Sequence, residues 1–201
     1  MPQKKNYLDL VINSLKKNRS KNLIEDQIIQ ENFTYEEIHQ KSLDFLRFLQ
    51  KKNLKSKDKI IIKLDNSTNY LISMLACFIG GLTLCPVDLQ IPKNKFLKLK
   101  KILNPKYIID SPKKIVFIKK GEVKINQKDF ISLILFTSGT TGEPKGIQLK
   151  LSSYLKLAKS FGKLIEYNNE TKIKHIFSRI NTWINYNLRS KNKLHKYIES
   201  L

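Results

Sequence analysis

Residues 131–151 read ISLILFTSGTTGEPKGIQLKL. The apolar run at 131–136 predicts a buried strand, and apolar residues alternate with polar ones again from 147 to 151. Between these two runs lie residues 137–146, which combine glycines and hydroxyl side chains with Pro144 and Lys145. Few connecting loops need this composition, so the stretch calls for a functional explanation.

The loop has the composition of a site for a polyphosphate. Gly139 and Gly142 allow backbone amides to turn toward one anion without a Cβ in the way. Hydroxyl groups add short donors, Pro144 restricts the backbone, and Lys145 supplies a charge that can follow a mobile phosphate. A Walker A motif is excluded because its lysine precedes Ser or Thr, whereas Gly146 follows here. The alternative is a plain polar turn between two strands, which the fixed order of residues disfavours.

The remainder of the chain predicts an α/β fold, a layered domain with a largely parallel sheet flanked by helices. Segments with helical apolar spacing alternate with short runs rich in β-branched residues, which is typical of this class. The predicted helices are 7–17, 35–49, 67–78 and 92–103, and the predicted strands are 60–64, 82–87, 106–109 and 131–136. Gly80 and Gly81 predict the end of the third helix. A hairpin is expected from 115–118 and 123–125, joined through Gly121.

The second predicted helix carries a start signal and a polar face. Thr34 and Glu37 have the spacing of a capping box, in which each side chain accepts a hydrogen bond from the other residue's backbone amide. We therefore assign Glu37 to capping and not to acid–base catalysis. Further along the helix, the apolar spacing predicts that Lys41, Asp44 and Lys51 face water.

Residues 137–146 resemble the phosphate loop of the adenylate-forming superfamily, the AMP-dependent (AMP-binding) synthetases and ligases. This superfamily includes acyl-CoA synthetases, the adenylation domains of nonribosomal peptide synthetases, and luciferases. Upstream, FTYEE at 33–37, DKIII at 58–62 and PVD at 86–88 are similar to further segments of the same enzymes. The resemblance covers residues 8–161 and implies the N-terminal portion of their large domain.

The resemblance implies a reaction in which a carboxylate attacks the α-phosphate of ATP, giving an acyl-adenylate and pyrophosphate. Transfer to a thiol usually follows, and Mg²⁺ is implied beside the nucleotide. The residues implied to hold the β- and γ-phosphates are Thr137, Ser138, Gly139, Thr140, Thr141, Gly142 and Lys145. The sequence identifies no catalytic side chain and predicts no metal-binding set of its own.

The resemblance fades past residue 161, where the family's adenine, ribose and magnesium residues and its mobile C-terminal domain would follow. We therefore expect residues 1–171 to be a partial AMP-binding domain and residues 172–201 to be a basic tail. Such a truncated chain is expected to be inactive alone, with a separate chain as one source of the missing part. Two alternatives stay open: a basic module that binds nucleic acid or an anionic membrane, and a non-functional gene fragment.

Composition narrows the choice of partners and of compartment. Lys and Arg number 38 against 17 Asp and Glu, a formal charge of +21, but they are spread along nearly every segment, so we do not expect a nucleic-acid partner. Cys77 and Cys85 lie among apolar residues without metal-ligand spacing, which predicts buried thiols in a reducing cytoplasm. The apolar stretch 70–87 is broken by glycines and predicts a buried helix and strand, so we expect a cytoplasmic protein without a transmembrane segment.

Overall fold

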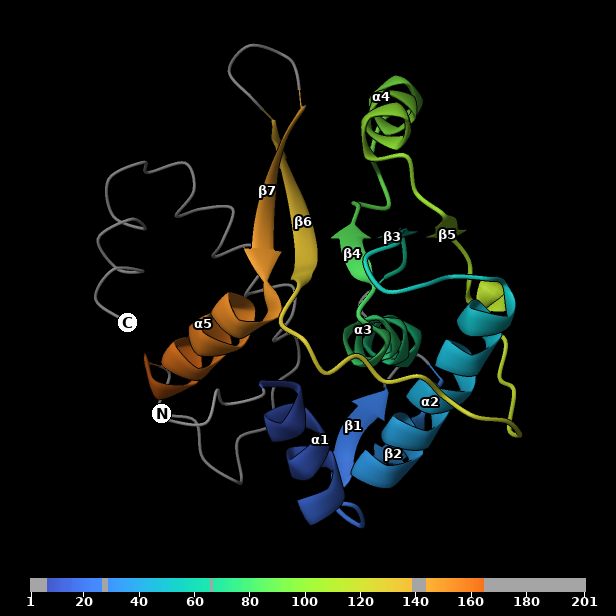
Figure 1. The fold of residues 1–201 in the computed structure, drawn as a ribbon, viewed down its shortest axis with the longest axis vertical. Coiled ribbons are helices and arrows are strands. Elements are labelled where there is room, and N and C mark those ends of the chain that lie inside the picture. Colours follow the sequence, from blue (N-terminus) through green and yellow to red (C-terminus); the bar gives the residue numbers. More distant parts are fainter. Residues whose placement is uncertain (1–6, 27–28, 66, 139–143, 165–201) are drawn as a thin grey trace. The chain divides into compact units, whose positions relative to one another are not determined.

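The computed structural model describes residues 7–26, 29–65, 67–138 and 144–164 (Figure 1). The chain divides into two compact units. The first runs to Leu151 and the second begins at Ser152. The described residues of the second unit, 152–164, belong to helix α5 (Leu151–Leu164), which the sequence did not predict. Within the described ranges, no helix has both the length and the apolar character that crossing a bilayer requires.

A five-stranded sheet forms the centre of the first unit (Figure 1). Its strands are β3 (Lys59–Ile62), β4 (Thr83–Pro86), β5 (Tyr107–Ile109), β6 (Ile131–Ser138) and β7 (Pro144–Lys150). Their order across the sheet is β5-β3-β4-β6-β7. All neighbouring pairs are parallel except β6 and β7, which are antiparallel. The predicted layered α/β class with a largely parallel sheet is therefore confirmed.

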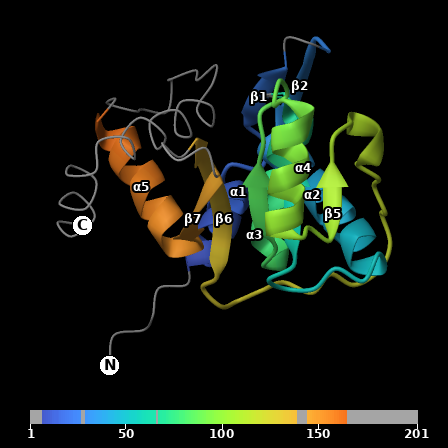
Figure 2. The same cartoon turned by 90° about the horizontal axis from the view of Figure 1, so that it is seen from above.

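Helices cover both faces of this sheet (Figure 2). The remaining elements of the unit are α1 (Tyr7–Lys17), β1 (Asn22–Asp26), β2 (Glu31–Thr34), α2 (Tyr35–Lys51), α3 (Thr68–Gly80), α4 (Lys93–Leu103) and the short 3-10 helix η1 (Pro112–Lys114). Helix α4 lies on one face, whereas α2 and α3 lie on the other and pack against each other. Strands β1 and β2 form a separate antiparallel hairpin before α2.

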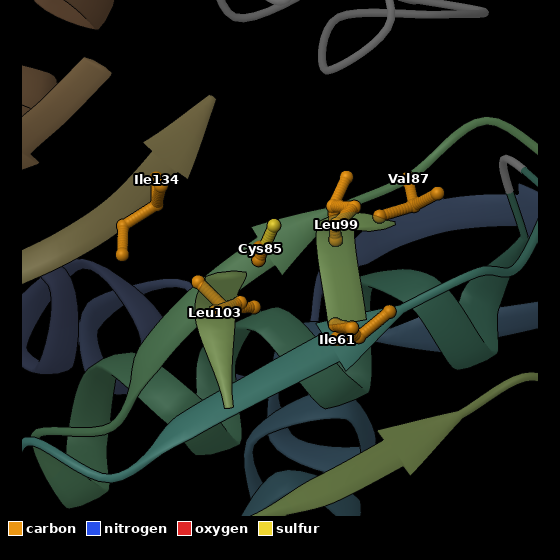
Figure 3. Close-up of a cluster of buried hydrophobic side chains, with 6 residues drawn as sticks. All are labelled: Ile61, Cys85, Val87, Leu99, Leu103 and Ile134. Atoms are coloured by element: carbon orange, nitrogen blue, oxygen red, sulfur yellow. The ribbon is translucent and has the colours of Figure 1, made fainter. Parts of the chain in front are cut away.

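Two apolar layers form because the strands are covered on both sides. The cluster between α4 and the sheet consists of Ile61, Cys85, Val87, Leu99, Leu103 and Ile134 (Figure 3). In β3, Ile60 and Ile62 alternate with Ile61 and point to the opposite face, where they are fully buried. A strand buried on both faces reads as a continuous apolar run, which explains the sequence of β3.

The helix ends follow the predicted signals. The amide of Glu37 donates to Thr34 Oγ1 over 3.2 Å, and the amide of Thr34 donates to Glu37 Oε2 over 2.8 Å, so the capping box is confirmed. Helix α3 ends at Gly80 and is capped by Gly81, whose φ of 72° is left-handed and suits glycine. At the other end of α3, Asp26 Oδ2 accepts hydrogen bonds from Thr68 N (3.2 Å) and Thr68 Oγ1 (2.6 Å), which ties the β1–β2 hairpin to the helix.

The predicted hairpin at 115–118 and 123–125 is wrong, because neither segment forms a strand. Residues 118–126, called the strap here, instead lie along α2. Arg47 Nε donates to the carbonyl of Gly121 over 2.7 Å. The side-chain amide of Gln50 donates to the carbonyl of Lys124 over 2.7 Å and accepts from its amide over 3.1 Å. The side chains of Arg47 and Gln50 thus bind backbone groups for which the prediction assumed a partner strand.

The strap also changes the environment of Asp44, which was expected to face water and is 5% exposed. Its carboxylate forms an ion pair with Arg47 and accepts a hydrogen bond from Gln40 Nε2 over 2.7 Å. Its backbone carbonyl accepts from the amide of Ile118 over 3.1 Å. The expectation for Asp44 is therefore wrong, because a segment far along the chain covers this side of α2. Lys51, by contrast, is exposed as expected.

Candidate functional site

The predicted phosphate loop connects two strands of the central sheet. Strands β6 and β7 pair so that Thr137 lies opposite Lys145 and Ser138 lies opposite Pro144. The backbone of three predicted site residues, Thr137, Ser138 and Lys145, is thereby placed at the ends of the two strands that residues 139–143 connect. The other predicted site residues, Gly139, Thr140, Thr141 and Gly142, lie outside the described residues.

The connection leaves the sheet at the carboxyl end of β6. Because β6 is parallel to β4, and β4 to β3, the carboxyl ends of these strands meet at one edge. In open α/β sheets, ligands bind in the crevice outside the carboxyl ends of the strands. The position of the loop is therefore the one in which this fold class holds its ligands.

Charged residues follow the neighbouring strands at the same edge. Lys63 comes directly after β3, and its Nζ lies 5.4 Å from the centroid of the Phe96 ring. Asp88 follows β4 and accepts a hydrogen bond from the amide of Gln90 over 2.8 Å. Asp110 follows β5 and pairs with Lys114 over 2.8 Å. Local contacts therefore engage both carboxylates.

Sequence reasoning missed Lys63 because it lies inside the predicted strand 60–64. The observed strand ends at Ile62, so Lys63 is the first residue beyond it. The available signal was Lys63 itself, because a lone lysine near the carboxyl end of an apolar run can mark the end of a buried strand.

Gly146 shapes the base of the loop. It pairs with Phe136 across the hairpin, and a Cβ added to it would lie 3.3 Å from Ile134 Cγ2 and 3.4 Å from the Phe136 ring. Both distances are shorter than ordinary carbon contacts of about 3.5–4.0 Å. The Phe136 ring therefore lies close against this glycine, and the loop begins from a well-packed hairpin.

The cysteine thiols and the Glu37 carboxylate lie in environments that explain them as structural groups. Burial raises the pKa of both cysteine thiols, that of Cys85 to about 12, so neither Cys77 nor Cys85 is primed as a nucleophile. Hydrogen bonds from the backbone and side chain of Thr34 lower the pKa of Glu37, as expected for a capping carboxylate. Among the described residues, no three His, Cys, Asp or Glu side chains are grouped so that they could hold a metal ion.

A comparison with models of known protein families shows to which family the chain belongs. The model of the AMP-binding enzyme family matches residues 16–122, just over half of the 201 residues. The chain belongs to the AMP-binding enzyme family. The matched residues of this AMP-binding chain contain α2, α3, α4 and strands β3 to β5, and they end before the phosphate loop.

The sequence relatives of the AMP-binding chain include very long synthetases. Gramicidin S synthase 2 from Brevibacillus brevis is 27% identical over 143 residues, which cover 63% of this chain and 3% of that protein. Nonribosomal peptide synthetase GRA1 from Gibberella zeae is 24% identical over 162 residues, covering 71% of this chain and 2% of the relative. The AMP-binding chain thus spans a small part of the length of these proteins.

Solved structures share the fold of the AMP-binding chain. McyG A-PCP complexed with phenylalanyl-adenylate superposes with a TM-score of 0.67 at 20% identity, covering 80% of this chain and 31% of that one. The N-terminal subdomain of Klebsiella oxytoca NpsA in complex with anthranilyl-AMSN gives a TM-score of 0.66 at 21% identity, covering 75% and 42%. The resemblance to adenylate-forming enzymes is confirmed, and the chain spans less than half of either structure.

Proposed function

We propose that the chain binds ATP through residues 137–146 and belongs to the branch of the family that activates amino acids. The observation that carries the proposal is the position of this loop. The loop connects the antiparallel strands β6 and β7 at the edge of the sheet where the parallel strands end. Thr137 and Lys145, which flank the loop, are paired across these two strands. That edge is where α/β sheets bind ligands.

The loop's donors suit the β- and γ-phosphates. Backbone amides next to Gly139 and Gly142 and the hydroxyl residues supply hydrogen bonds, and Lys145 supplies positive charge. These groups hold the leaving pyrophosphate while a carboxylate oxygen bonds to the α-phosphorus and the α–β bridging bond breaks. Donors placed where charge develops contribute to rate as well as to binding.

Mg²⁺ is implied by the family, and its chemistry is to neutralise charge on the phosphates. We propose that the ion would arrive bound to the phosphates of ATP. The chain's contribution is then to orient the phosphates through the hydroxyl residues of the loop.

An amino acid as the carboxylate substrate is supported by the relatives, which include peptide synthetases by name. We also propose that residues 1–171 act as part of an AMP-binding domain, with 172–201 as a basic tail. On this proposal the chain binds nucleotide but does not complete adenylation by itself. A separate chain that carries the remaining groups would restore turnover.

Binding of a fluorescent ATP analogue to the full chain, with Mg²⁺ present, tests the proposal. Lys145→Met should weaken binding about tenfold or more, since a charge-assisted contact contributes about 1.5–3 kcal/mol. Lys150→Met, which removes an exposed lysine at the far end of the same strand, is the matched control and should bind as the wild type does. Equal affinity of all three proteins would reject the loop as the phosphate site.

A further inference from the structure

A concave site lies near the amino ends of strands β3, β4 and β6, whereas the phosphate loop follows the carboxyl end of β6. It is a groove of about 650 Å³ between the C-terminal half of α2 and the strap, 118–126. Small-molecule sites in proteins commonly occupy about 300–1,000 Å³, so the groove is large enough for a ligand. Among the described residues of the proposed nucleotide site, 137–138 and 144–146, none lines the groove.

The walls of the groove are held by specific contacts. Arg47 and Gln50 of α2 bind the backbone of the strap at Gly121 and Lys124. The end of the strap is fixed as well, because the amide of Asn126 donates to the carbonyl of Ile79 over 2.9 Å. The groove is therefore already formed and does not depend on a ligand to assemble it.

The rim of the groove is strongly basic. Four exposed lysines contribute to its lining from α2, from the turn after α2 and from the strap: Lys51, Lys55, Lys120 and Lys124. None of the four forms an ion pair with another residue in the described part of the chain. Glu122 is the acidic residue of the lining. Like charges gathered around one groove repel one another, and a bound anion would relieve this repulsion.

The groove also has an apolar component. Ile125 is 46% exposed and belongs to the lining, beside the buried side chains of Leu46, Leu54 and Leu82. We propose that the groove binds a small amphiphilic anion, a molecule with an apolar body and a carboxylate, sulfonate or phosphate group. The apolar body would cover Ile125, and the lysines would surround the anionic group.

The geometry makes this site independent of the proposed ATP site. Ser56, Leu82 and Asn126 of the lining precede strands β3, β4 and β6, whereas the phosphate loop follows β6. Strand β6 contains eight residues, which at about 3.3 Å each separate the two ends by roughly 25 Å. The groove therefore lies at the opposite end of β6 from Thr137 and Ser138.

The test uses 8-anilinonaphthalene-1-sulfonate, a fluorescent amphiphilic anion, titrated into the full chain at low salt. We expect saturable binding that the double variant Lys51→Gln/Lys124→Gln weakens about tenfold, since each exposed ion pair changes affinity by up to about fivefold. The matched control, Lys95→Gln/Lys101→Gln, removes two exposed lysines of α4 and should leave the affinity unchanged. Equal weakening in the two double variants would show a response to net charge alone and would overturn the proposal.

A second pair of variants and a competition experiment test whether the probe binds in the groove and not elsewhere on the chain. Ile125→Glu places a carboxylate in the groove and should weaken probe binding well beyond Ile125→Gln, which has nearly the same size. Saturating ATP should leave the probe bound. Displacement by ATP, or equal binding by the two Ile125 variants, would overturn the groove as the site. Circular dichroism of each variant confirms that the comparison is made between folded proteins.

Discussion

Replacing Gly80 by alanine tests how closely α2 and α3 pack on their shared face. A Cβ at Gly80 would lie 2.5 Å from Leu46 Cδ1, whereas carbon contacts are normally about 3.5–4.0 Å. Leu46 is fully buried, so it can move only by displacing its neighbours. Overpacking of this kind costs about 1–3 kcal/mol, against which alanine gains about 0.5–1 kcal/mol over glycine in a helix. We expect Gly80→Ala to lower the free energy of unfolding by about 1–2 kcal/mol.

The sign of this effect should reverse when Leu46 is shortened. Leu46→Ala alone should cost about 2–5 kcal/mol, because it leaves a cavity in the core. It also removes the methyl group that the new Cβ would meet, so Gly80→Ala should now stabilise by about 0.5–1 kcal/mol through helix propensity. The coupling between the two changes is then about 2 kcal/mol, within the range seen for residues in contact.

Urea denaturation of the four proteins, followed by far-ultraviolet circular dichroism, measures this coupling. Gly81→Ala is the matched control, because its left-handed φ of 72° and a Cβ 2.6 Å from Asn126 make it unfavourable for reasons unrelated to Leu46. It should destabilise the chain by a similar amount in both backgrounds. If Gly80→Ala stabilises the chain while Leu46 is present, or if the coupling is below about 0.5 kcal/mol, the described packing is wrong.

Four further predictions concern other parts of the described structure. Thr34→Ala should lower the free energy of unfolding by about 1 kcal/mol through loss of the helix cap, as measured by urea denaturation. Because Thr34 lowers the pKa of Glu37, the wild type should be more stable than Glu37→Gln at neutral pH, and the difference should shrink as the pH falls below about 4; a constant difference would contradict this role. Cys77 and Cys85 should resist iodoacetamide at pH 8 in the native chain and react in urea, and rapid native labelling would show that they are accessible. Arg47→Ala should speed hydrogen exchange of residues 118–124 by tenfold or more, since two of its contacts hold backbone carbonyls there, whereas unchanged exchange would mean that the strap is held by other contacts.

Local signals in the sequence were sufficient for much of the fold. The capping box of Thr34 and Glu37 depends on residues three positions apart, and the end of α3 depends on the left-handed conformation of Gly81. The inner strand β3 could be recognised because burial on both faces requires a continuous apolar run. In each case the residues that determine the structure are neighbours in sequence.

The strap could not be predicted because its partners are distant in sequence. Gln50 and Lys124 are 74 positions apart, and nothing near Lys124 indicates that a side-chain amide will satisfy its backbone. The burial of Asp44 has the same origin, since helical spacing alone places it toward water. Contacts of this kind depend on how the whole chain folds.

The candidate site also has one part that the sequence could predict and one part that it could not. The composition of residues 137–146 was enough to predict a phosphate-binding role, which stays a prediction. The residues that lie beside the loop depend on the order of the strands in the sheet, which could not be predicted from the sequence. Asp88 lies at the same edge only because β4 pairs with β6, and the paired residues Leu84 and Leu133 are 49 positions apart in the sequence.

Hydrogen exchange followed by mass spectrometry tests the central claim most directly, because it locates bound nucleotide along the chain. With Mg²⁺ present, saturating ATP should slow exchange in peptides that cover residues 137–146, and AMP, which lacks the β- and γ-phosphates, should slow it much less. Peptides from the strap should be unchanged by either nucleotide. No protection at 137–146, or equal protection by ATP and AMP, would contradict the proposal that this loop holds the nucleotide's terminal phosphates.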